Sequence, residues 1–149
     1  MTARSGKGCC WYQTEIILPP KGKGVHKITN ILTELSFLRD IQIGVCNISL
    51  KNTSASLSIN ECWGDDVGAD MDTFLNTVVP EDAPYLHTIE GPDGMTAHIK
   101  ASLIGSSVTI PITDGKLNMN TWQGVWLLEH RYHGGPRTLI VTVQGCTKD

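Results

Sequence analysis

The sequence contains few charged residues, few Phe and Tyr residues, and no long apolar run. Charged residues make up 18% of its 149 residues, and there are only 2 Phe and 3 Tyr. No stretch approaches the ~20 apolar residues that a membrane-spanning helix requires. The formal net charge of −3 supplies no basic field that would attract nucleic acid. We therefore expect no membrane span and no nucleic-acid partner.

The cysteines show no pattern typical of a disulfide framework or a zinc ribbon. Their number is odd, their spacing is irregular, and no Cys-x-x-Cys motif occurs among Cys9, Cys10, Cys46, Cys62 and Cys146. Arg4 and Lys7 are not followed by an apolar segment, so the N-terminus does not resemble a secretory signal. This usage favours free thiols in a reducing compartment, and we expect a cytoplasmic protein.

Widespread nucleotide-binding and hydrolase motifs are also missing. The sequence has no Walker loop, no Gly-x-Gly-x-x-Gly, no Gly-x-Ser-x-Gly and no His-Glu-x-x-His. Candidate chemistry must therefore be sought where polar residues gather.

The chain is rich enough in hydrophobic residues, at 40%, to bury the core of one domain. We expect a flexible extension over residues 1–10 and a single domain over residues 11–149. β-Favouring residues predict strands over residues 11–18, 25–28, 41–50, 55–60, 107–113, 116–119, 125–131 and 137–144. Strands and helices are mixed rather than alternating, which favours an α+β fold with a largely antiparallel sheet.

Three segments have helical spacing. The first is capped by Thr29 or Asn30 and continues to about residue 38. The second begins at Asp65 and Asp66, carries an apolar stripe and ends before Pro80. The third covers residues 95–103. Turn residues predict two hairpins, one at residues 114–115 and one around residues 134–136.

The long acidic connection over residues 81–94 carries one histidine, and a second histidine follows it. His87 and His98 are eleven residues apart, and Glu90 lies between them. They could bind a metal or act as an acid–base pair near neutral pH. The alternative is that they are ordinary loop residues.

A second candidate cluster lies at the end of the strand over residues 55–60. Glu61 could join Asp65 and Asp66 in holding Mg²⁺, which prefers oxygen ligands. The simpler interpretation is that the two aspartates are helix caps.

The segment from Glu129 to His133 offers weaker candidates. His130 resembles a metal ligand, but neighbouring side chains on a strand point to opposite faces, and the pattern leaves open whether Glu129 or His130 faces a site. Lys100, Arg131 and Arg137 are candidate phosphate contacts, although single basic residues usually lie at the solvated surface.

Several short motifs together resemble one family. They are Thr53-Ser54-Ala55-Ser56-Leu57, Asn60-Glu61, Tyr85-x-His87-x-x-Glu90-Gly91, Ala97-His98-Ile99-Lys100-Ala101-Ser102-Leu103 and Thr121-Trp122-Gln123-Gly124. In order and spacing the chain resembles the YjbQ family of small proteins, often labelled secondary thiamine-phosphate synthases. The similarity covers roughly residues 11–145.

The resemblance implies a two-layer α+β fold with packed antiparallel sheets and about three helices, assembled as a homotrimer. It implies a reaction that joins a pyrimidine diphosphate to a thiazole phosphate and releases pyrophosphate, with a divalent metal, Mg²⁺ or Zn²⁺, and a small phosphorylated metabolite as ligand. It implies catalytic roles for His98, His87 and Glu61. On matching positions the family's polar pocket comprises Asn60, Glu61, His87, His98, Thr121 and Gln123. Together with the candidates above, this gives His87, His98, Glu61 and His130 as expected metal ligands. The expected substrate contacts are Asn52, Thr53, Ser54, Asn60, Lys100, Ser102, Thr121, Gln123 and Arg131.

One departure from the family pattern concerns the residue before Thr53. The family usually has a histidine there, whereas this chain has Asn52. An amide cannot act as a base at neutral pH and is a poor substitute for imidazole as a zinc ligand. Two hypotheses follow: an enzyme with weak or altered thiamine-phosphate-synthase activity, or a non-catalytic trimer that binds a metal or a phosphate-bearing ligand.

Overall fold

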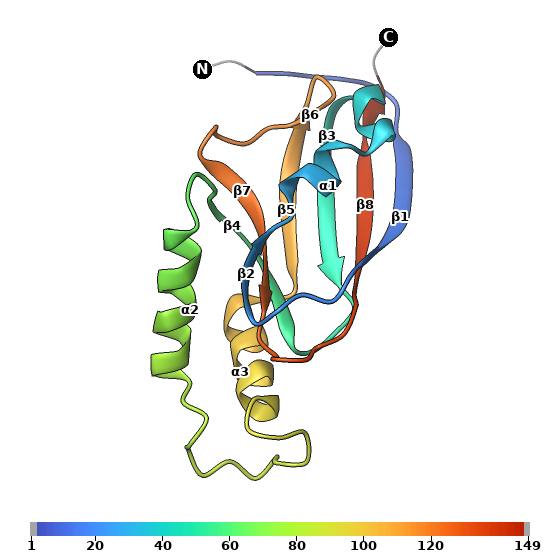
Figure 1. Cartoon of the computed structure of the whole chain (residues 1–149). Coiled ribbons are helices and arrows are strands. Elements are labelled where there is room, and N and C mark those ends of the chain that lie inside the picture. The colour runs from blue at the N-terminus through green and yellow to red at the C-terminus, as the bar shows by residue number, and fades with distance from the viewer. Residues whose placement is uncertain (1–2, 148–149) are drawn as a thin grey trace.

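Two antiparallel β-sheets pack face to face in the computed structural model, which describes residues 3–147 (Figure 1). The larger sheet has the strand order β1-β8-β3-β5-β6 and the smaller one β2-β7-β4. The strands are β1 (Cys10–Leu18), β2 (Gly24–Lys27), β3 (Ile41–Leu50), β4 (Ala55–Glu61), β5 (Ser107–Thr113), β6 (Lys116–Leu117), β7 (Gln123–Glu129) and β8 (Arg137–Thr147). The expected α+β fold with packed antiparallel sheets is confirmed.

The main core lies between the sheets because both contribute alternating apolar residues to it. Leu139, Val141 and Val143 of β8 face Val125 and Leu127 of β7 in one buried cluster. β7 is also covered on its other face, where Trp126 and Leu128 contact the helices. A strand buried on both faces reads as a continuous apolar run, which explains the pattern Val-Trp-Leu-Leu.

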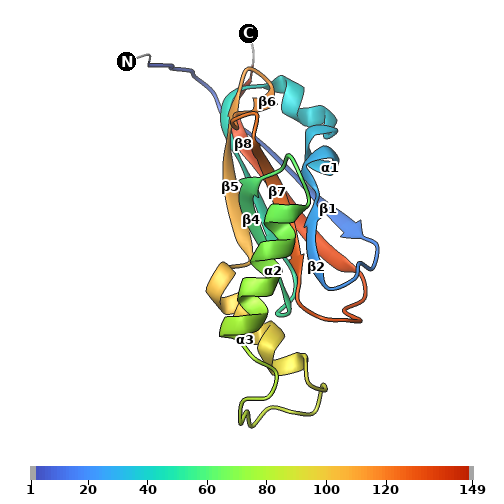
Figure 2. The same cartoon turned by 60° about the vertical axis from the view of Figure 1, so that its left-hand side comes forward.

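Two helices cover the outer face of the smaller sheet. α2 (Asp66–Val78) packs beside β2, and α3 (Gly94–Ile104) packs beside β4 (Figures 1 and 2). Both agree closely with the predicted helices. The connection over residues 79–93 leads away from the sheets before it returns to α3 (Figure 1). This arrangement places the loop histidine and the α3 histidine at the same end of the molecule.

The predicted first helix is wrong in its continuity. It consists of α1 (Thr29–Thr33) and a separate 3₁₀ turn, η1 (Ser36–Asp40), with Leu35 in an extended conformation between them. Leu32 and Leu38 are both buried against the sheets. A helix of one turn has little stability of its own, so packing of these two leucines decides the local path.

The two predicted hairpins have different outcomes. The Asp114–Gly115 turn joins β5 to β6, and both residues have positive φ, 51° and 79°, as a tight two-residue turn requires. The second hairpin is wrong. β7 pairs with β2 and β4, whereas β8 pairs with β1 and β3, so residues 130–136 cross between the sheets.

The predicted division into an extension over residues 1–10 and a domain over 11–149 stays a prediction, and its outer ends, residues 1–2 and 148–149, lie outside the described residues. Within residues 3–147, no helix has the length and apolar character needed to cross a membrane.

Candidate functional site

One carboxylate and two imidazoles converge where the 79–93 connection meets α3. His87 Nε2 lies 2.5 Å from Glu90 Oε1, and His98 Nε2 lies 2.8 Å from the same oxygen. The three potential ligand atoms lie within 4.8 Å of one another. His87 and Glu90 come from the loop and His98 from the second turn of α3, so the cluster forms only when these elements are in contact.

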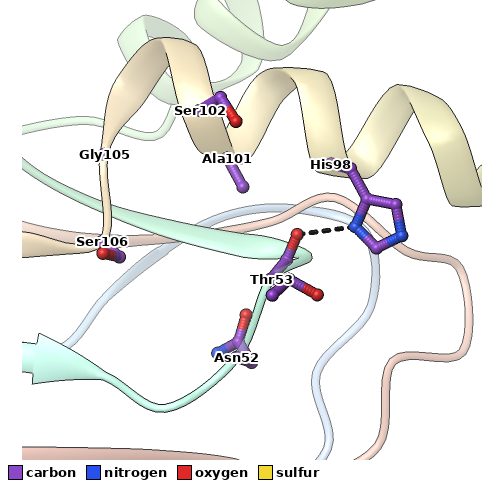
Figure 3. A pocket seen from close by; sticks show the side chains of 7 residues that line it. All are labelled: Asn52, Thr53, His98, Ala101, Ser102, Gly105 and Ser106. Carbon is purple, nitrogen blue, oxygen red and sulfur yellow. Dashed lines mark hydrogen bonds between the residues drawn. The ribbon is translucent and has the colours of Figure 1, made fainter.

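The backbone fixes which nitrogen of His98 faces the cluster. Its Nδ1 lies 2.8 Å from the carbonyl oxygen of Thr53, which can only accept, so Nδ1 carries a proton (Figure 3). Nε2 therefore faces Glu90 either as a second N–H of an imidazolium or, in the neutral ring, as a lone pair. The Thr53 contact and then the Glu90 carboxylate raise the pKa of His98 above its ordinary 6.5.

Glu90 is held in its ionised form. Hydrogen bonds from His87 and then His98 lower the pKa of the Glu90 carboxyl to about 2. A positive charge close to a carboxylate stabilises its ionised form. A proton on either imidazole would supply that charge to Glu90, and so would a cation held between the two rings. The cluster is therefore an anionic group matched to protons or to a metal ion.

Arg131 and Asp93 anchor the segment that carries Glu90. Arg131 donates from Nη2 to the Glu90 carbonyl oxygen at 3.0 Å and from Nη1 to Glu90 Oε2 at 3.3 Å. Its Nε lies 3.1 Å from Asp93 Oδ2, which also accepts the Tyr132 N–H at 2.8 Å. Because Arg131 binds Oε2, only Oε1 of Glu90 is directed at the histidines. Arg131 holds the loop and does not face an open phosphate site.

An open pocket of about 620 Å³ adjoins the cluster on the side of His98 (Figure 3). This size is within the range of small-molecule sites. Its walls come from the β3–β4 connection and the C-terminal half of α3, namely Asn52, Thr53, His98, Ala101, Ser102, Gly105 and Ser106. The predicted residues Asn52, Thr53 and Ser102 thus lie together with His98.

Asn52 has a structural role in its turn. Its Oδ1 accepts the backbone N–H groups of Ser54 and Ala55 at 2.9 and 2.8 Å, while its Nδ2 is buried without a hydrogen-bond partner. The amide oxygen is therefore committed to the chain and is not directed at the histidines. This asparagine initiates the turn that leads into β4.

Four predicted residues lie at the opposite end of the smaller sheet. Asn60 and Glu61 end β4, and Gln123 begins β7 opposite Glu61. Glu61 Oε1 accepts the Trp63 N–H at 2.8 Å, and Thr121 contacts Cys62 through its carbonyl oxygen. β4 leads from Ala55, beside the Asn52 turn, to Glu61, so six residue steps of strand, roughly 20 Å, separate the two groups. The structure does not bring this group to the histidines.

Three other predicted residues are buried. Lys100, 1% exposed, donates from Nζ to Asn76 Oδ1 at 2.7 Å on the side of α3 that faces α2. His130 Nε2 lies 2.8 Å from Ser56 Oγ, and burial, followed by the charge of Lys100, lowers the pKa of His130 to about 3. Ser54 is buried, and its carbonyl oxygen accepts from Arg137. None of the three reaches the cluster.

Glu90 lies between the two histidines in the sequence, but no role was predicted for it. The signal was present, because His-x-x-Glu puts an imidazole and a carboxylate within reach of each other in one turn of chain. What the sequence did not contain was the position of His98 relative to that turn.

Comparison with known proteins identifies the family. The family described as UPF0047 protein YjbQ-like matches residues 14–146. The chain is 46% identical over 136 residues to UPF0047 protein YjbQ of Salmonella typhimurium, covering 91% of this chain and 99% of that protein. It is 38% identical to a UPF0047 protein of Synechocystis, over 90% of this chain and 92% of the relative. The chain belongs to the UPF0047 YjbQ family, as the sequence motifs indicated.

Solved structures agree with this assignment. An uncharacterised conserved protein of the YjbQ/UPF0047 family from Clostridium acetobutylicum superimposes with a TM-score of 0.76 at 34% identity, covering 86% of this chain and 97% of that one. A YbjQ-like protein of unknown function from Sulfolobus solfataricus has a TM-score of 0.82 at 22% identity, covering 93% and 99%. The second likeness shows the fold alone.

The expected thiamine-phosphate-synthase activity is wrong. The matching family and its relatives are described as UPF0047 or YjbQ proteins, one of them of unknown function, and none of these descriptions points to thiamine-phosphate synthesis. The geometry gives a physical reason to abandon the assigned roles. Glu61, intended as a metal ligand beside the histidines, ends β4 at the end far from the turn that contacts His98.

Proposed function

We propose that His87, Glu90 and His98 bind one divalent transition metal and that the adjoining pocket holds a small ligand of that metal. The observation that carries this proposal is the Nδ1 contact of His98 with Thr53. It directs Nε2 to the point where His87 Nε2 and Glu90 Oε1 also converge. A metal-ligating histidine commonly donates its other N–H to a backbone carbonyl in this way.

The donor set favours zinc over magnesium. Two imidazoles and one carboxylate suit Zn²⁺ and similar ions, whereas Mg²⁺ prefers oxygen ligands alone. Three protein ligands also leave a coordination position open, as in sites where the metal binds water or a substrate. The pocket beside His98 supports placing a ligand there.

A small phosphorylated metabolite stays our proposal for that ligand. A metal held by two neutral imidazoles and one carboxylate retains positive charge, which favours a phosphate oxygen at the open position. The Ser102 and Ser106 hydroxyls on the pocket wall support the same class, since hydroxyls can donate to phosphate. We also propose a cytoplasmic protein, which the five free thiols support.

The subunit arrangement belongs to the same proposal. We infer a homotrimer, supported by apolar side chains on the outer face of the larger sheet. Trp11, Ile17 and Val45 are 62%, 69% and 42% exposed, and Trp11 and Val45 lie opposite Gln144 on its two sides. Such a surface favours contact with another chain.

Zinc binding by purified, untagged protein tests the metal site. We expect about one Zn²⁺ per chain after equilibrium dialysis and elemental analysis. His98→Ala should weaken binding at least ~10-fold, because removing a ligand loses a coordinate bond and the convergence around it. His26→Ala is the matched control, since His26 Nε2 contacts the Gly22 carbonyl on a separate turn.

Two results would contradict the metal site. One is wild-type protein that takes up no zinc at micromolar concentrations. The other is equal zinc loss in the His26 and His98 variants. Titration of inorganic phosphate into zinc-loaded and zinc-free protein separates the ligand from the metal: equal phosphate affinity in both states would discard the phosphate ligand but leave the metal site in place.

A further inference from the structure

Two cysteines from opposite ends of the chain meet at one corner of the larger sheet. β1 pairs antiparallel with β8, and the last register pair is Cys10 with Gly145. One residue further out, this register places Cys9 opposite Cys146. All five cysteines are free thiols in this structure.

Both side chains point to the outer face of the sheet. Gln13 and Thr142 are register partners on this face, where Gln13 Nε2 donates to Thr142 Oγ1 at 2.9 Å. Side chains repeat on the same face every second residue, so two further steps lead from this pair to Cys9 and Cys146. The 3.9 Å contact of Gln144 Nε2 with Cys9 Sγ agrees with that assignment.

The chain before β1 covers this corner. It crosses the end of the sheet (Figure 1), and Arg4 pairs with Asp114 of the β5–β6 turn at 3.0 Å. Gly6 lies so close over Cys146 that any side chain on it would collide with Sγ. A hollow of about 370 Å³ is lined by both Cys9 and Cys146. Cys9 is exposed and Cys146 is buried beneath this segment.

We propose that Cys9 and Cys146 are a redox-active pair that forms a reversible disulfide with a low-molecular-weight disulfide such as oxidised glutathione. The exposed Cys9 thiolate attacks one sulfur of the oxidant, forming a mixed disulfide and releasing one thiolate. The Cys146 thiol, as its thiolate, then attacks the Cys9 sulfur and releases the second thiol. Two protein thiols are oxidised, and one small disulfide is reduced to two thiols.

The positions of the other three cysteines do not suit them to this reaction. Cys10 points to the inner face, where its Sγ donates to the Gly145 carbonyl oxygen at 3.2 Å. Cys46 is fully buried in the core, and burial raises the pKa of its thiol to about 11. Cys62 lies beyond β4 of the smaller sheet, near the Thr121 carbonyl. Cys9 and Cys146 are therefore the two cysteines that share the outer face of the sheet, and Cys9 is the exposed one.

Peptide mapping of the whole chain tests the pair. We expect oxidised glutathione to give one intramolecular bond, found by non-reducing digestion and mass spectrometry as a Cys9–Cys146 cross-linked peptide. Cys10→Ser, the matched control next in sequence, should form it to the same extent. Cys9→Ser should abolish it. Cys146→Ser should leave Cys9 as a glutathione adduct.

A second measurement does not depend on the Cys146 variant folding. Closing a loop that spans nearly the whole chain should raise the Tm of oxidised wild type by roughly 5–10 °C over the reduced protein, and Cys9→Ser should show no such rise. A cross-link through Cys10, no cross-link in wild type, or the same Tm rise in Cys9→Ser would overturn the proposal.

Discussion

The side chains of the candidate site are arranged around the carboxylate of Glu90. Its Oε1 receives two imidazoles, and Arg131 contacts its Oε2 and its backbone oxygen. Protons and metal ions compete for the same histidine nitrogens, because only a deprotonated imidazole binds a metal. Zinc affinity should therefore rise with pH through the titration of the histidines.

The pH behaviour of His98 gives a prediction at the scale of this residue. In the folded, metal-free protein the pKa of His98 is raised above 6.5, so the ion pair with Glu90 stabilises the fold below pH 6.5 and this contribution is lost as pH rises through the raised pKa. Glu90 has the opposite sign: its contribution is present above pH 4.5 and is lost as pH falls towards about 2.

NMR titration of the histidine ring protons checks this prediction. His98 should titrate above 6.5, and Glu90→Gln should move its midpoint down while retaining the Thr53 contact. Asp114→Asn is the control, because it removes a carboxylate from the separate β5–β6 turn and should leave the His98 midpoint at its wild-type value. A His98 midpoint below 6.5, or one unchanged in Glu90→Gln, would show that the carboxylate does not act on this imidazole.

At the scale of elements, a buried ion pair joins the two sheets where the chain crosses between them. Glu129 ends β7 and Arg137 begins β8, and Arg137 donates from Nε and Nη2 to the two carboxylate oxygens at 2.7 and 2.5 Å. Glu129 is fully buried, and Arg137 nearly so. Two side chains in this geometry fix the corner that replaces the expected hairpin.

Removing one partner of this pair should be costly. Glu129→Ala leaves the Arg137 guanidinium buried without its carboxylate, and we expect the free energy of unfolding to fall by about 3–5 kcal/mol. Arg4→Ala breaks the Arg4–Asp114 pair, whose side chains are about half exposed, and should change it by at most about 1 kcal/mol. Urea unfolding measures both, and equal losses would refute the distinction.

At the scale of the whole molecule, the proposed homotrimer would form its contacts through the outer face of the larger sheet. Light scattering should give a mass about three times 16.3 kDa. Val45→Glu and Ile17→Glu place charges on the exposed apolar face and should reduce that mass to a monomer without unfolding the chain. Phe74→Glu is the matched control, since Phe74 is an exposed apolar residue on α2, away from this face, and it should leave the mass unchanged. A wild-type monomer would discard the trimer.

Local patterns in the sequence predicted much of the secondary structure. α2 begins after two aspartates and presents an apolar stripe, and the Asp114–Gly115 pair adopts the positive φ angles that its turn needs. The helix and the turn each depend on residues that are close together in the sequence, so both could be predicted without knowledge of the tertiary structure. The family motifs likewise indicated the family from the sequence alone.

Predictions from local patterns failed where a segment packs against residues that are distant in the sequence. The 130–136 segment has the composition of a hairpin turn, but the buried partners of β7 and β8 lie in different sheets. In the same way, four residues expected near His98 form a separate group, because β4 runs away from His98 toward them. They are Asn60, Glu61, Thr121 and Gln123.

The sequence by itself determined α2, α3, the strands, the family and the two histidines in and after an acidic loop, since these follow from spacing along the chain. The tertiary structure alone decided that Glu90 joins the histidines, that Asn52 caps a turn, and that Cys9 and Cys146 line the same hollow. The physical reason is that each of these contacts joins segments whose separation is set by sheet register and layer packing, which local preferences do not encode.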